Sequence, residues 1–212
     1  MPLLQTSSTH HNIPVPWQAW REQIEIDIAE WNKTWEAFKK DNLEKNFSLC
    51  QYPKIQLSLD DFVRTFWAYT DLINHVESKL NVLQSIPAAQ QVVMFITTPY
   101  LATLRMIGQK KALETWYHVG IRLGMYFSME NIGLHAINLA ELTKKPRIVK
   151  GLEHSCHFFH DAWSIGIPLH NHEGEIIAYL GLMGSLDHDP DIIFSYLYSI
   201  QSTLGNLKLR DN

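Results

Sequence analysis

The feature that most constrains the fold is a pair of long apolar segments, residues 163–171 and 175–184, joined by the short sequence NHEG. Gly174 at the end of this turn can adopt the positive φ that a tight hairpin requires. Alternation along the second segment places Leu180 on one face of a strand and Tyr179 on the other. The sequence therefore predicts two long strands that pair as an antiparallel hairpin.

Shorter patterns around this hairpin predict the rest of an α+β fold. Apolar alternation predicts strands, spacings of three and four predict helices, and glycine or proline marks where several of them end. The predicted order is long helices, then strands and short helices around an antiparallel sheet, then a closing helix, with the helices on one side of the sheet. The elements predicted after residue 87 are a hairpin of strands 92–97 and 102–108, a helix 109–120 that ends at Gly120, a helix 130–145 with His135 near its middle, a strand 146–151 and a closing helix from about Asp189.

The first part of the chain is predicted to be helical after a leader. Residues 1–16 are polar and contain three prolines, so we expect them to be poorly ordered. Apolar and mostly aromatic residues recur at spacings of three and four over 17–38, which is typical of an amphipathic helix. Ser58, with Asp61 at the capping-box spacing, begins a second helix that is predicted to run in one piece to Leu83. The predicted regions are a flexible leader 1–16, a helical extension with dimerisation helices 17–86, and a sheet-containing domain 87–212 that includes the closing helix.

Charge and cysteine content exclude several classes of protein. The chain has 18 Lys and Arg against 22 Asp and Glu, a net charge of −4, and no dense basic cluster, so we expect no direct binding of nucleic acid. The longest strongly apolar runs, such as 92–96, are far too short to span a bilayer, and the first sixteen residues do not resemble a secretory signal. Cys50 and Cys156 lie far apart in sequence and do not indicate a disulfide framework. The sequence therefore predicts a cytoplasmic protein without a membrane segment.

Residues 153–163, EHSCHFFHDAW, permit three interpretations. A metal site is one, but His154, His157 and His160 at i, i+3 and i+6 would not converge on one face of a helix, so any metal would need ligands from elsewhere. A thiolate paired with a neighbouring histidine is the second, although Cys156 is better explained as a small buried apolar residue. A segment that crosses a ligand pocket is the third. We predict no metal ligands and no catalytic residues.

A series of short motifs from Glu130 onward points to a family. SMENIGLHAI is followed by a Pro-containing strand, a Gly-x-Glu-His turn and a Trp strand, with matching residues Gly133, Ala136, Ile137, Pro146, Gly151, Glu153, His154, Trp163, Pro168, Gly174, Gly181, Leu182 and Gly184. In this order the motifs resemble the GAF-like sensory region of the sigma-54-dependent transcription activators of the acetoin and glycerol regulator type. The resemblance covers roughly residues 55–207. The chain departs from the family at Leu134 and His135, which replace Thr-Asn, and at Met183, which replaces Asp.

The resemblance implies a fold and a function. GAF-like domains have an antiparallel sheet flanked by helices and hold small molecules between the sheet and the segments that cross it. The chain contains no phosphate-binding GxxxxGK[ST] loop and no DNA-reading helix-turn-helix, so the resemblance implies a sensor without enzymatic activity or cofactor, with sigma-54 activator output modules as possible partners in a longer chain. The candidate ligand-binding residues on the crossing segments are Trp116, Tyr117, Phe127, His135, His154, Phe158, His160 and Trp163.

The predicted function is a small-molecule-sensing regulatory domain of a bacterial transcription regulator that signals through a helical dimer layer. The aromatic residues of the first helices support the homodimer, since they can form its seam, although they can equally pack internally as a helical layer. One alternative is a GAF module that binds a protein partner and has no ligand. The other is a redox sensor linked to a metal or haem through His154, His157 or His160 with Cys156. The aromatic residues in question are Trp20, Trp31, Trp35, Phe66 and Tyr69.

Overall fold

The computed structural model describes residues 53–84, 89–188, 190, 193 and 197. They form an α+β domain around a five-stranded sheet in which every paired neighbour is antiparallel. The strand order is β2-β1-β5-β4-β3. This confirms the predicted α+β class and antiparallel sheet. The strands are β1 Val93–Thr97, β2 Thr103–Ile107, β3 Arg147–Lys150, β4 Ala162–His170 and β5 Ile176–Ser185.

The predicted long hairpin is present and lies at the centre of the sheet. Strands β4 and β5 pair along their length, and Gly174 in the turn between them has φ 83°. Gly166 and Gly181 face each other in this pairing. A Cβ on Gly166 would overlap the backbone carbonyl of Ala136, and a Cβ on Gly181 would overlap the side chain of Ile137. The two glycines therefore allow the start of a helix to rest directly on the strands.

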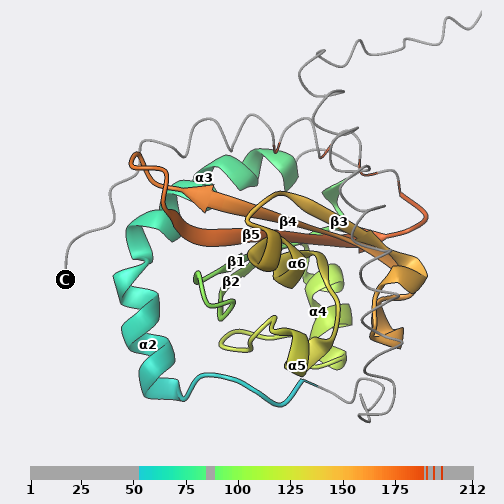
Figure 1. Cartoon of the computed structure of the whole chain (residues 1–212). Coiled ribbons are helices and arrows are strands. Elements are labelled where there is room, and N and C mark those ends of the chain that lie inside the picture. Colours follow the sequence, from blue (N-terminus) through green and yellow to red (C-terminus); the bar gives the residue numbers. More distant parts are fainter. Residues whose placement is uncertain (1–52, 85–88, 189, 191–192, 194–196, 198–212) are drawn as a thin grey trace, which may run out of the picture.

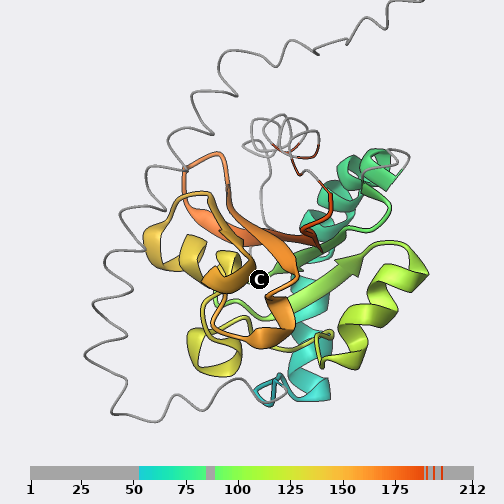
Figure 2. The same ribbon diagram turned by 90° about the vertical axis from the view of Figure 1, so that its right-hand side faces the viewer.

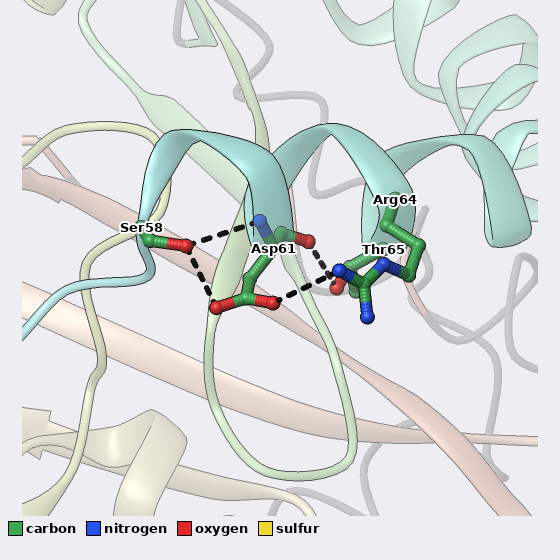
Figure 3. Close-up of polar contacts among 4 residues, drawn as sticks. All are labelled: Ser58, Asp61, Arg64 and Thr65. Carbon is green, nitrogen blue, oxygen red and sulfur yellow. Dashed lines mark hydrogen bonds and ion pairs between the residues drawn. The ribbon is translucent and has the colours of Figure 1, made fainter.

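Helix α3 (Thr70–Gln84) packs on one face of the sheet, and those of its described side chains that are buried in the core are apolar. Helix α2 (Leu59–Ala68) precedes it and has no fully buried residue. The predicted cap of α2 is confirmed: the Asp61 N–H donates to Ser58 Oγ at 3.1 Å (Figure 3). The buried residues of α3 are Leu72, Ile73, Val76, Leu80 and Leu83.

The prediction of a single helix from Ser58 to Leu83 is wrong at Tyr69. Tyr69 has φ −101° and ψ 7° and separates α2 from α3, which run in different directions in Figure 1. Neither glycine nor proline marks the break. The change of direction keeps the chain on the sheet, because Phe66 and Tyr69 both pack, partly buried, against the apolar cluster below α3.

Helices also cover the other face, so the prediction of helices on one side is wrong. Figure 1 shows α3 above the strands and α6 below them, and Figure 2 shows the same separation from the side. The strands are apolar on both faces, which requires cover on both. The elements of the second face are α4 Lys110–His118, α5 Met129–Ile132, α6 Ala136–Thr143 and the short 3₁₀ turns η2 Gly151–Glu153 and η3 His157–Phe159.

The predicted helix 130–145 is present in two pieces, which moves His135 from the middle of a helix to the start of one. Gly133 follows α5 with φ 66°, a conformation that ends the helix. His135 is extended, with φ −149° and ψ 151°, and is the N-cap of α6. The family resemblance marked Gly133, but periodicity alone did not separate the two helices.

Several predictions lie outside the described residues. These include the leader, the helix over 17–38 and most of the closing helix. The described residues Ile193 and Leu197 of that closing segment are buried in the same apolar cluster as α3. Each helix in the described ranges is too short or too polar to cross a membrane.

Candidate functional site

A buried histidine at the start of α6 is the centre of the candidate site. His135 has no exposed surface, and its Nδ1 accepts a hydrogen bond from the Ile137 N–H at 3.2 Å. The Asn138 side chain completes the cap by accepting from the His135 N–H at 3.1 Å. Because Nδ1 accepts, the ring proton of the neutral imidazole lies on Nε2. This Nε2–H donor is fully buried and has no hydrogen-bond partner among the described residues.

A second buried histidine is fully hydrogen-bonded beside the first. His154 Nδ1–H donates to the Gly151 carbonyl at 3.1 Å, so its Nε2 is the acceptor for the Ser164 hydroxyl at 2.8 Å. Ser164 Oγ also accepts from the Ala136 N–H at 3.2 Å. These bonds form a continuous chain from η2 through strand β4 to the first turn of α6. Both polar atoms of the His154 ring are therefore satisfied, unlike those of His135.

Both histidines are held in the neutral form. Burial lowers the pKa of His154 to about 4, although its bond to Gly151 opposes this and the nearby His160 adds to it. Burial lowers the pKa of His135 well below its usual range, and the neighbouring His154 acts in the same direction. The site is thus a polar but uncharged environment at neutral pH.

Three aromatic rings pack around the ring of His135. The ring centroids of Phe127, Phe159 and His154 lie 5.0, 5.3 and 5.6 Å from that of His135. Trp116 of α4 lies 5.9 Å from Phe159. Such an arrangement, an apolar aromatic wall with one or two placed polar groups, is typical of small-molecule sites. We refer below to His135, Phe127, Phe159 and His154 as the aromatic box.

A surface groove of about 510 Å³ lies beside the aromatic box, between α4 and the η3 turn. Trp116 and Phe158 contribute apolar surface to it, while Lys111 and Asp161 are its charged residues. The volume falls within the range of ligand pockets, about 300–1,000 Å³. The groove lining does not include His135 or His154, so the groove does not reach these two histidines. The remaining lining residues are Gln90, Gln91, Gln109, Ala112, Thr115, Val119, Ala162 and Ser185.

The structure brings some of the predicted site residues together. Phe127, His135 and His154 form the aromatic box, and Trp116 reaches it through Phe159. His160 is partly buried, and its Nε2 lies 3.2 Å from the His154 carbonyl, to which it donates. Whether any of these residues contacts a ligand stays a prediction.

Three other predicted residues lie apart from the box. Tyr117 is on the outer side of α4 and is 46% exposed. Phe158 is partly buried and lines the groove. Trp163 is buried on the opposite face of the sheet, in the cluster of α3, and its Nε1–H donates to the His188 carbonyl at 3.1 Å.

Sequence reasoning missed Phe159 and Ser164. Ser164 carried a usable signal, because it is a polar residue between Trp163 and Ile165 in an otherwise apolar strand. Phe159 carried none, because nothing local distinguishes it from Phe158 until the η3 turn places one inside and the other at the groove.

The histidines and cysteine of residues 153–163 do not come together as a metal site. No three His, Cys, Asp or Glu side chains within the described ranges are placed to share an ion. Cys156 is buried in the apolar cluster of the second face. His157 stacks on Phe158, with ring centroids 4.0 Å apart. The described geometry therefore gives no support to a metal ion held by three or more of these side chains.

The fold and the site together define a GAF-like α+β domain with a polar site buried between the sheet and the segments that cross it. The chain is similar in structure to a chain of the E. coli DhaR(N)–DhaL complex, with a TM-score of 0.70 and 16% identity over 80% of this chain. It spans 58% of the length of that chain. This likeness shows the fold.

Two further similarities are weaker. One is to the GAF domain/HD domain protein from Geobacter sulfurreducens, with a TM-score of 0.44 and 10% identity over 66% of this chain and 95% of the other. The other is to the C-terminal domain of the E. coli transcriptional regulator KdgR, with a TM-score of 0.37 and 9% identity over 64% of this chain and 99% of the other. No known protein family matches the sequence, and no curated protein does.

Proposed function

We propose that this chain is a regulatory sensing domain, not an enzyme, and that it binds a small molecule at the aromatic box. The observation that carries the proposal is the Nε2–H of His135, a completely buried donor without a partner among the described residues. Leaving a buried polar group unsatisfied costs about 1–3 kcal/mol. A ligand that supplies an acceptor removes that cost. A residue that only capped α6 would need the Nδ1 acceptor but not the Nε2–H donor.

The position of His135 also provides a route for a signal. His135 caps α6, and α6 rests on Gly166 and Gly181 at the centre of the sheet, opposite α3. A ligand that binds more tightly to one arrangement of α6 would shift the population toward it. We propose that this shift passes through the sheet to the helical layer and to a homodimer formed through that layer.

A protein-binding module is the second candidate, and helix α2 favours it. Leu59, Val63 and Trp67 lie at i, i+4 and i+8 and are 76%, 44% and 69% exposed. An exposed apolar stripe of this kind commonly marks an interaction surface. The structure of the DhaR(N)–DhaL complex, to which this fold is similar, is itself an assembly of two proteins.

A substitution at His135 separates the two candidates. His135→Asn keeps a side-chain acceptor at the N-cap for the Ile137 N–H, while its shorter side chain leaves no donor at the deep position of Nε2–H. We expect small oxygen-containing organic compounds to raise the melting temperature of the wild-type protein, and to raise it much less in this variant. A broad compound set with no effect on the wild type would contradict small-molecule sensing and leave partner binding through α2 as the better account.

A further inference from the structure

The η3 turn is the wall between the groove and the aromatic box. Phe159 is 1% exposed and contacts the rings of His135 and His154 on the inner side. Its neighbour Phe158 lines the groove on the outer side, as does Trp116, whose ring also meets Phe159. The side chains of Trp116 and Phe158 at the groove and of Phe159 behind them thus separate a surface groove of about 510 Å³ from the buried donor of His135.

The backbone of this wall is held by its own turn. The Phe159 N–H donates to the Cys156 carbonyl at 3.0 Å, and the His160 N–H donates to the His157 carbonyl at 3.1 Å. The turn lies between β3 and β4 in sequence and takes no part in the strand pairing of the sheet. Local bonds of this kind can open without disrupting the sheet, and such segments belong to the less stable parts of a fold.

The uncharged surroundings of His135 restrict which ligands the aromatic box can bind. The ring neighbours of His135 are Phe127, Phe159 and a neutral His154, so the box offers no counter-charge to an ion. Taking an ion out of water without a partner costs far more than burying a hydrogen-bonded neutral group. Among the four residues of the aromatic box, the unsatisfied polar group that the described structure shows is the His135 Nε2–H, which requires an acceptor. At the groove, the amides of Gln90, Gln91 and Gln109 and the opposite charges of Lys111 and Asp161 form a polar lining without net charge.

We infer that the groove is the access route to His135, that Phe159 is its gate, and that the ligand is an uncharged small molecule with an apolar body and one acceptor oxygen. A ketone, an amide or an alcohol meets this description. Its oxygen accepts from His135 Nε2–H, and its apolar part takes the place that the Phe159 ring leaves. This inference rests on the proposed function, because it specifies the ligand class and the route for the same site.

A matched set of compounds tests the ligand class. Phenylacetone is the ketone, isobutylbenzene its hydrocarbon analogue, phenylacetate an anion and phenethylammonium a cation of similar size. We expect calorimetric titration of the wild type to give at least about tenfold tighter binding for the ketone than for the other three, the value of one hydrogen bond of about 1.4 kcal/mol. In His135→Asn the ketone and the hydrocarbon should bind equally. Tighter binding of either ion than of the ketone overturns the ligand class.

The access route is tested by association rates of phenylacetone in stopped-flow measurements. Phe159→Leu should raise the rate constant by about tenfold, since a smaller side chain opens the wall, and Ala112→Trp, which fills the groove, should lower it by a similar factor. Met94→Leu is the control, because Met94 is equally buried but lies on β1 in the apolar cluster of the α3 face, away from the wall. Its rate should stay within about twofold of the wild type.

The outcomes distinguish the two levels of the hypothesis. If none of the four compounds binds the wild type, the inferred ligand class fails, whereas the proposed sensing site fails only if the broad compound set also leaves the melting temperature unchanged. If the ketone binds in a His135-dependent manner but neither Phe159→Leu nor Ala112→Trp changes its association rate, the access route is wrong while the sensing site stands. Ala112→Trp decides the route alone if Phe159→Leu does not fold.

Discussion

The two faces of the sheet differ in what they bury. On the α3 face, the described side chains of the helix that are buried are all apolar and form one cluster with apolar side chains of the strands. On the α6 face, His135, Asn138, His154 and Ser164 are buried together and connected by hydrogen bonds. Polar groups cost free energy when buried and are tolerated when paired, so a face that contains them is less stable than it could be. The α3 face therefore provides stability, and the α6 face holds the groups able to recognise a ligand.

The first prediction concerns a core substitution on the α3 face. Leu80 is completely buried there, so Leu80→Ala should lower the free energy of unfolding by about 4 kcal/mol, through lost burial and a cavity. Urea unfolding followed by circular dichroism measures this. The preference for phenylacetone over isobutylbenzene should persist in the folded fraction. The exposed Leu59→Ala is the control and should change stability by less than about 0.5 kcal/mol. A loss of this ligand preference in Leu80→Ala would show that ligand recognition on the α6 face depends on packing on the α3 face.

The second prediction concerns the loss of stability that acid causes through the α6 face. The pKa of His154 is about 4 in the folded protein against an ordinary value of 6.5, so the unfolded chain takes up a proton between these values before the folded protein does. Stability should be complete above pH 6.5 and fall as the pH is lowered toward 4. A difference of about 2.5 pH units corresponds to about 3 kcal/mol. His135, whose pKa is also lowered, adds to the loss in the same direction.

Urea unfolding at several pH values measures this acid loss. His154→Gln, which cannot take up the proton, should give a visibly flatter curve between pH 6.5 and 4. Identical curves for the variant and the wild type would mean that His154 is not a neutral buried group in the folded protein.

The elements that the sequence predicted correctly carry strong local signals. Examples are the hairpin at Gly174, the cap at Ser58 and the end of α4 near Gly120, which has φ 87°. In each case a single residue has a conformational or hydrogen-bonding property that the turn or cap requires. Such features depend on few neighbouring residues, so the amino-acid sequence alone is enough to predict them.

The features that could not be predicted depend on contacts distant in sequence. The break at Tyr69 follows from packing on the sheet and has no local marker. Trp163 and Ser164 lie on opposite faces of β4, and no local pattern says which face the helices with His135 will cover. The role of His135 as a cap became clear only once α5 and α6 were separate helices. The site was therefore predicted as a set of residues but not as a geometry.

The third prediction tests the close contact of α6 with the strands. An alanine at Gly166 would place its Cβ against the backbone carbonyl of Ala136, and backbone cannot rotate out of the way. Gly166→Ala should destabilise the protein by about 2 kcal/mol and weaken phenylacetone binding, because α6 moves and carries His135 with it. Gly174→Ala at the hairpin turn meets no atom within 4 Å and should leave ligand binding unchanged, although its φ of 83° costs some stability. Equal binding in both variants would show that α6 is not held by this contact.

The smallest expected effect concerns Ser164, which links the two histidine-bearing segments. Ser164→Ala leaves both the Ala136 N–H and His154 Nε2 without their bonds of 3.2 and 2.8 Å, and should cost about 1.5 kcal/mol. Ser128→Ala is a matched control, since the Ser128 hydroxyl is buried without a partner among the described residues and its removal leaves no group unsatisfied. Urea unfolding of both variants gives the comparison. If Ser128→Ala proves the more destabilising of the two, the hydrogen-bonded chain through Ser164 does not stabilise the α6 face, and the polar groups there would have to be explained by ligand binding alone.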